Sequence, residues 1–86
     1  MKTLLKIKKE AIERQNLCLI LMDAREVLIE EAVRTSRLRG DPADEIRMRK
    51  GDADCKAQTM ARRCMRVYTF DEALSIVKEY VDIQIV

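Results

Sequence analysis

The 86-residue sequence contains no histidine and no tryptophan, and it has one proline and two glycines. Without histidine there is no imidazole to act as a base near neutral pH, so a Ser-His or Cys-His nucleophilic pair is impossible within the chain. Two glycines are too few for a glycine-rich phosphate-binding loop. The composition therefore argues against an enzyme, and we expect no cofactor.

Cysteine is also scarce. The three residues, Cys18, Cys55 and Cys64, are odd in number and form no CxxC pair. That spacing disfavours both a disulfide framework and a zinc site, so we expect no metal centre. Free thiols suit a reducing compartment, and we expect a cytoplasmic protein.

Long apolar runs are missing as well. The longest, Leu17 to Met22, has six residues, whereas a membrane span needs about 20. Lysines interrupt the N-terminal stretch, so it is no signal peptide. We expect no membrane contact and a single helical domain over residues 1–86. A chain near this size buries only about 60% of its unfolded surface, which makes a second copy a natural partner.

Residues 3–38 lack glycine and proline and are rich in Leu, Lys, Glu, Arg and Ala, which favour helix. Gly40 follows, in the position where a glycine commonly ends a helix. The pattern predicts a helix from Thr3 to Leu38, or two helices separated by a break at residues 14–16.

A second helix is predicted from Pro42 to about Tyr68. Asp41 is a suitable N-cap and Pro42 suits the first helical position. Gly51 weakens the middle of this helix and is a point where it could divide. A short elbow at residues 39–41 predicts a long antiparallel helical hairpin.

The sequence Thr69-Phe-Asp-Glu is a capping box, with Thr69 at the N-cap and Glu72 at the third helical position. It predicts a short C-terminal helix from Phe70 to about Tyr80. Residues 81–86 alternate between apolar and polar, which is typical of a short strand. Such a strand needs a partner: a second copy, residues 65–69 or another protein. A frayed or helical tail is the alternative. The predicted fold is therefore all-α, with one optional terminal strand.

Apolar residues between Leu17 and Val33 cover an arc of roughly 240° on a helical wheel, wider than one amphipathic stripe. Such a helix must be covered from two sides, and a second copy can supply one cover. We therefore expect a homodimeric helical bundle. The predicted dimer interface consists of Leu4, Ile7, Ala11, Cys18, Met22, Ile29 and Val33.

Charge is distributed unevenly along the chain. Residues 34–68 carry ten basic and five acidic groups, and residues 69–86 carry one basic and four acidic groups. Nine of these ten basic residues lie in two clusters along the chain, and eight of the nine are arginine. An arginine binds a planar acidic group through two N–H donors at once. A solvated helix face is the plainer explanation of the same charges. The predicted partner-binding residues are Arg34, Arg37, Arg39, Arg47, Arg49, Lys50, Arg62, Arg63 and Arg66.

These features favour a non-catalytic helical regulator that binds and inhibits, or adapts, another protein with an acidic surface. The size fits a small bacterial or phage accessory protein, such as a host-defence inhibitor. The alternative is a small dimeric nucleic-acid-binding protein that uses the same basic patches. Three aromatic residues offer no platform for stacking bases, and the acidic C-terminal region would repel a phosphate backbone, so nucleic acid is the second choice.

Overall fold

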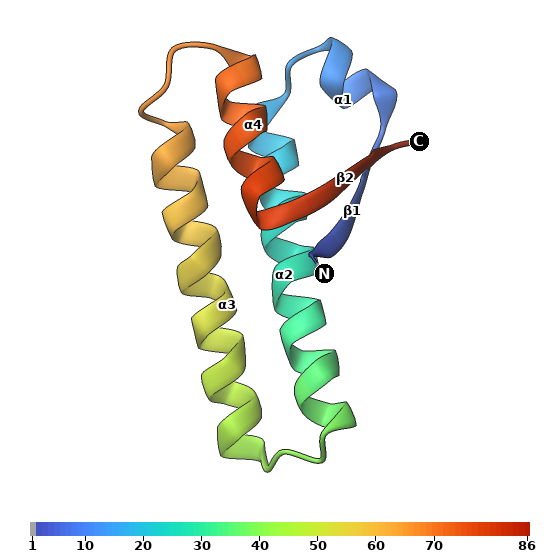
Figure 1. Ribbon diagram of the computed structural model, residues 1–86, viewed down its shortest axis with the longest axis vertical. Coiled ribbons are helices and arrows are strands. Elements are labelled where there is room, and N and C mark those ends of the chain that lie inside the picture. The colour runs from blue at the N-terminus through green and yellow to red at the C-terminus, as the bar shows by residue number, and fades with distance from the viewer. Residues whose placement is uncertain (1) are drawn as a thin grey trace.

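The computed structural model describes residues 2–86. Within them the chain is mostly helical, as predicted, but it also contains a two-stranded sheet (Figure 1), so all-α is an incomplete description. In chain order the elements are β1 (Thr3–Ile7), α1 (Lys9–Glu13), α2 (Leu17–Leu38), α3 (Ala43–Cys64), α4 (Phe70–Tyr80) and β2 (Val81–Ile85).

The N-terminal segment is a strand, and the prediction of helix there is wrong. Leu5 and Ile7 are each 2% exposed, while Lys6 between them is exposed. This period-two alternation buries one face of β1. β1 pairs in parallel with β2, with Thr3 opposite Val81. The terminal strand therefore has the chain's own N-terminal segment as its partner, and none of the three predicted partners is used in this structure.

A break at residues 14–16 separates α1 from α2, at the position that the second of the two predictions gave, although α1 begins at Lys9 and not at Thr3. Gln15 has a φ of 51°, in the left-handed region. Its N–H donates to the Ile12 carbonyl at 3.0 Å, and the Asn16 N–H donates to the Ala11 carbonyl at 2.9 Å. These two bonds satisfy carbonyls at the end of α1. The Asn16 side chain then caps α2, because its Oδ1 accepts from the Leu19 N–H at 3.2 Å.

α2 ends at Leu38, and Gly40 follows its C-cap Arg39 with a φ of 76°, in the position that the sequence indicates. Asp41, however, is not the N-cap of α3. Pro42 occupies that position without a side-chain cap, and Asp41 accepts a hydrogen bond from Ser36 instead. α3 runs through Gly51 without dividing and ends at Cys64, earlier than predicted.

α4 has the predicted bounds. Thr69 Oγ1 accepts from the Glu72 N–H at 3.1 Å, so Thr69 is confirmed as the N-cap. The Glu72 carboxylate accepts from the Thr69 hydroxyl at 3.0 Å, whereas in a complete capping box it would accept from the Thr69 backbone N–H. This cap satisfies an amide in the first turn, where four N–H groups lack helical partners.

α2 and α3 lie side by side, and α4 and the sheet gather at one end of them (Figure 1). The core lies at that end, which we call the packed end. On α2 the buried apolar residues stop at Leu28, and on α3 they begin at Ala57. We call residues 29–56 the projecting end, where Ser36 alone is buried. The core consists of Leu5, Ile7, Ala11, Ile20, Leu21, Ala24, Leu28, Ala57, Met60, Cys64, Ala73, Ile76, Val77 and Val81.

Candidate functional site

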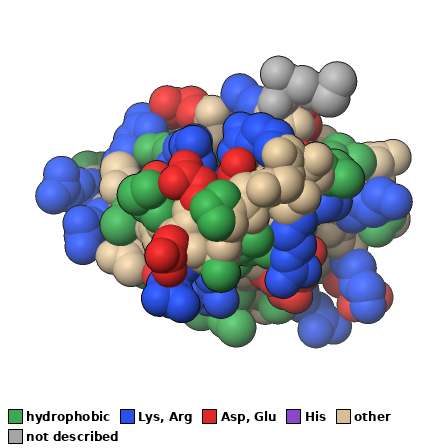
Figure 2. Space-filling model, turned by 90° about the horizontal axis from the view of Figure 1, so that it is seen from below, with side chains coloured by type: hydrophobic (Ala, Val, Ile, Leu, Met, Phe, Trp, Pro, Cys, Tyr) green, Lys and Arg blue, Asp and Glu red, His purple; other side chains and the backbone are tan. Residues whose placement is uncertain are grey.

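The nine cationic residues do not form one continuous patch. Figure 2 views the molecule from the elbow end and shows Lys and Arg side chains spread around it, with Asp and Glu between them. Four of the nine are engaged within the chain. The shortest distances of these ion pairs are 2.6 Å for Arg34 and Glu31, 3.3 Å for Arg39 and Asp41, 3.1 Å for Arg49 and Glu45, and 2.9 Å for Arg63 and Glu79.

Arg39 belongs to the elbow itself. The Asp41 carboxylate accepts from Ser36 Oγ at 2.5 Å and from Arg39 at 3.3 Å. The Ser36 hydrogen bond, helped by the charge of Arg39, lowers the pKa of Asp41. Ser36 is fully buried, so this bond satisfies a hydroxyl that has no access to water. Arg39 and Asp41 thus hold the turn between α2 and α3.

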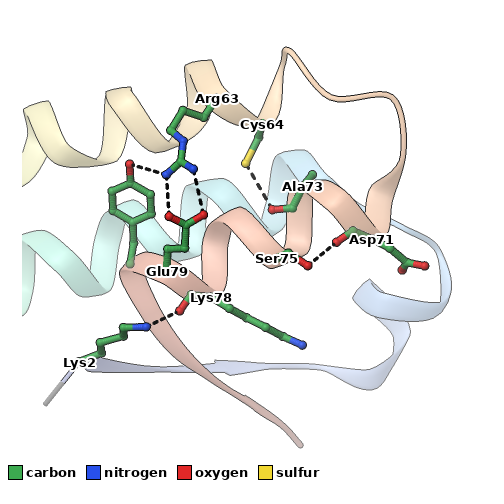
Figure 3. Close-up of polar contacts among 9 residues, drawn as sticks. Lys2, Arg63, Cys64, Asp71, Ala73, Ser75, Lys78 and Glu79 are labelled. Carbon is green, nitrogen blue, oxygen red and sulfur yellow. Dashed lines mark hydrogen bonds and ion pairs between the residues drawn. The ribbon is translucent and has the colours of Figure 1, made fainter.

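Arg63 joins α3 to α4. Its guanidinium donates to both carboxylate oxygens of Glu79, at 3.1 and 2.9 Å, and to the Tyr80 hydroxyl at 3.2 Å (Figure 3). It also lies 5.7 Å from the centre of the Tyr80 ring. The hydrogen bond from Arg63 lowers the pKa of Glu79. Arg63 therefore has a structural role in this chain, which its position in the sequence did not reveal.

The other five predicted cations are Arg37, Arg47, Lys50, Arg62 and Arg66. All five are exposed, and none forms an ion pair within residues 2–86. They fall on two surfaces. One surface is a groove beside α2 that contains Arg37 and Lys50. The other is the outward side of α3.

The groove runs along α2 from Met22 to Leu38, so it begins beside the packed end and extends over the projecting end. A hollow of about 450 Å³ is lined by apolar Ile29, Val33 and Leu38, and by Arg37 and Lys50 beside them. A second hollow of about 430 Å³ shares Ile29 and Lys50 with the first. We call the two together the α2 groove. Its remaining lining residues are Met22, Asp23, Arg25, Glu26, Glu30 and Arg34.

The second surface is the outer α3 face, formed by Arg47, Gln58 and Arg62 on α3 and by Arg66 just beyond it. At about 100° per residue, Arg62 lies opposite the buried Ala57 and Cys64, and Arg47 and Gln58 lie on the flank of that buried side. All four of these side chains are exposed. The two arginines on α3, Arg47 and Arg62, are about 22 Å apart along the helix axis.

The predicted dimer residues divide into two groups. Ile7 and Ala11 are 2% and 7% exposed and pack in the chain's own core, so they offer no surface to a second copy. Leu4 and Met22 are 50% and 64% exposed. Cys18 is also exposed, whereas Ile29 and Val33 are half-buried and line the α2 groove.

The predicted binding residues did not include the acidic residues of the α2 groove, Asp23, Glu26 and Glu30. The signal was present, because these acids and the bases Arg34 and Arg37 recur on α2 every three or four residues, which places them on one side of a helix. The spacing of Glu26 and Glu30 from Arg34 was interpreted as support for the helix and not as part of a binding surface.

Within residues 2–86 no three Cys, Asp or Glu side chains gather as a metal site. Burial raises the pKa of the Cys64 thiol, which opposes formation of a reactive thiolate. In the same part of the chain, no helix has the length and hydropathy of a membrane span.

The comparisons with known proteins identify no relative. No family model matches the sequence, and neither a curated protein nor a solved structure gives a significant match.

Proposed function

We propose that this protein is a non-catalytic helical regulator that binds an acidic partner protein through the outer α3 face. The observation that carries the proposal is the state of Arg47, Arg62 and Arg66. These residues are exposed and have no ion pair within residues 2–86. Their charges are therefore available to a partner.

The contrast with Arg63 supports this assignment. Arg63 is adjacent to Arg62 in the sequence, yet its guanidinium is occupied by Glu79 and Tyr80. Arg62 lies one helical step away and points to solvent. An arginine presents five N–H donors in a fixed fork and binds carboxylates through two of them. A partner that offers carboxylates at helical spacing fits this face.

The proposal includes two features of assembly. We infer that α2 and α3 act as one antiparallel hairpin, since they pack along their length and are joined by the short elbow. We also infer that the chain is a homodimer, since Met22 and Leu38 expose apolar surface beside the α2 groove. The outer α3 face contains none of the lining residues of that groove, so the two interactions are compatible.

Capture from the source cell tests partner binding. The wild type, an R47E/R62E/R66E variant and a K6E/K8E/R14E control are used as bait. The control makes the same charge change at exposed residues away from α3. We expect one protein to be retained by wild type and control and lost by the α3 variant. In purified form it should bind the wild type about tenfold more tightly than the variant or better. An identical set of captured proteins for all three baits contradicts the proposal.

Salt dependence separates protein binding from the nucleic-acid alternative. Duplex DNA and RNA are titrated at low and moderate salt. Nucleic-acid binding releases counterions and therefore weakens steeply with salt. We expect no tight binding at low salt. Tight, salt-sensitive binding that is lost in R47E/R62E/R66E would favour the alternative.

A further inference from the structure

The exposed side of α2 changes charge along its length. Asp23 and Glu26 lie toward its N-terminal half, and Arg34 and Arg37 lie toward its C-terminal half. Glu30 lies between them and lines both hollows of the α2 groove. Arg25 lies among these acids but is paired with Asp54 of α3 at 2.8 Å, so the groove is acidic at one end and basic at the other.

Apolar side chains accompany the charges along the same stretch. Met22 and Leu38 mark the two ends and are 64% and 76% exposed, with Ile29 and Val33 between them. From Met22 to Leu38 the helix rises about 24 Å. Surface of this length is sufficient for a helix-on-helix contact.

The charges on this side of α2 are complementary to those of a second α2 that runs in the opposite direction. If residue i of one α2 faces residue 60 − i of another antiparallel α2, Asp23 meets Arg37 and Glu26 meets Arg34. An interface between two identical copies must be self-complementary in this way, because each residue's partner is repeated across the two-fold axis.

We propose that a second copy of this chain occupies the α2 groove, with the two α2 helices antiparallel and the two-fold axis passing near Glu30. This inference rests on the proposed homodimer and assigns its orientation and register. In this arrangement the acidic end of the groove in each copy faces the basic end of the groove in the other.

The centre of the interface is also accounted for. The two Glu30 carboxylates approach each other near the axis, which alone would be unfavourable. Lys50 lines both hollows together with Glu30, so each copy brings one cation to the same place. Arg34 already pairs with Glu31, but its five donors allow a further carboxylate on the facing helix.

A charge exchange tests the register. The variant R34E/R37E makes both ends of the groove acidic, and the variant D23R/E26R makes both ends basic. Each variant alone should dimerise about tenfold more weakly than the wild type or worse, because like charges then face each other. Mixed together, they should form a heterodimer, since every facing pair is again opposite in charge. Sedimentation with one variant labelled measures both effects.

Two controls separate the possible failures. R62E/R66E changes the same number of charges on the outer α3 face and should dimerise like the wild type. I85K places a charge on exposed Ile85 of β2 and should also leave the dimer intact, unless copies assemble through the sheet edge. A monomeric wild type overturns the proposed homodimer and the register together. A wild-type dimer that R34E/R37E does not weaken overturns the register alone.

A cross-link gives an answer that does not depend on charge. The variant E30C, with Cys18 and Cys55 replaced by serine, places one exposed thiol at the proposed two-fold axis. The proposed register brings this thiol against the same thiol of the other copy, so oxidation should give a covalent dimer. The control Q58C, in the same background, places the thiol on the outer α3 face and should cross-link more slowly. An E30C variant that cross-links no faster than Q58C contradicts the proposal.

Discussion

The packed end and the projecting end share two helices but differ in what holds them. At the packed end α2 is covered by α3, α4 and the sheet, and Ile20 and Ala24 are fully buried. At the projecting end α2 packs on α3, with the start of β1 beside Glu31 and Arg34, and Ile29 and Val33 remain half-buried. The same helix is therefore buried among several elements at one end and half-exposed at the other.

A matched pair of substitutions on α2 tests the difference in packing between the two ends and should have the largest effect. Ile20→Ala removes a fully buried side chain and should lower the free energy of unfolding by about 3 kcal/mol. Ile29→Ala removes the same atoms from a half-buried site and should cost about 1 kcal/mol. Urea denaturation at low protein concentration measures both. Equal losses would show that the two ends are packed alike.

The cap of α4 tests the packed end without touching its core. Thr69→Ala removes the acceptor for the Glu72 N–H and should lower stability by about 1 kcal/mol. Ser75→Ala serves as the control, because Ser75 Oγ donates only to the Asp71 carbonyl within the helix and is exposed. If Ser75→Ala lowers stability as much as Thr69→Ala does, the loss in Thr69→Ala is not due to the N-cap.

At the projecting end few side chains are buried, so the helix propensity of a residue should have a larger influence on stability there than its packing. Nothing lies within 4 Å of a Cβ built at Gly51, and the residue is inside α3. Gly51→Ala should therefore stabilise the protein by about 0.5–1 kcal/mol. Gly40→Ala should destabilise it, although its space is also open, because the φ of 76° disfavours any residue with a Cβ. Thermal melts of the two variants in opposite directions would support this reasoning, and a shift in the same direction would contradict it.

The smallest expected effect concerns the ion pair between Arg63 and Glu79 at the packed end. Arg63 lowers the pKa of Glu79 below its ordinary value of 4.5, so the folded state favours the ionised carboxylate. This contribution to stability is present above pH 4.5 and is lost as the pH falls through the lowered pKa. The Glu79→Gln variant should lose less stability on acidification than the wild type. Because the pair is exposed, the difference should be small and should shrink with added salt. Parallel pH profiles for the two proteins would contradict the assignment.

The features that the sequence predicted correctly are those that depend on short-range interactions along the chain. The α4 cap at Thr69, the glycine at the end of α2 and the break at residues 14–16 depend on neighbours within a few positions. β1 depends on β2, which lies more than 70 residues away, and helix-favouring composition concealed it. The alternation of Leu5 and Ile7 with lysines was the available signal.

The candidate site was predictable only as a set of charges. The sequence indicated which residues are basic and on which helix they lie. It could not show that Arg39 closes the elbow or that Arg63 binds Glu79, since those contacts depend on how the chain turns and how α4 packs. The placement of Asp41 shows the same limit, because a suitable N-cap was drawn instead to buried Ser36.

The most direct test of the contrast between the two ends is amide hydrogen exchange along α2, measured at low and at high protein concentration. In the monomer, amides in residues 29–38 should exchange much faster than those in residues 19–28, because fewer buried contacts oppose local opening. At high concentration the slower exchange should extend into residues 29–38 as the second copy covers the α2 groove. Uniform protection along α2 that does not change with concentration would contradict the account.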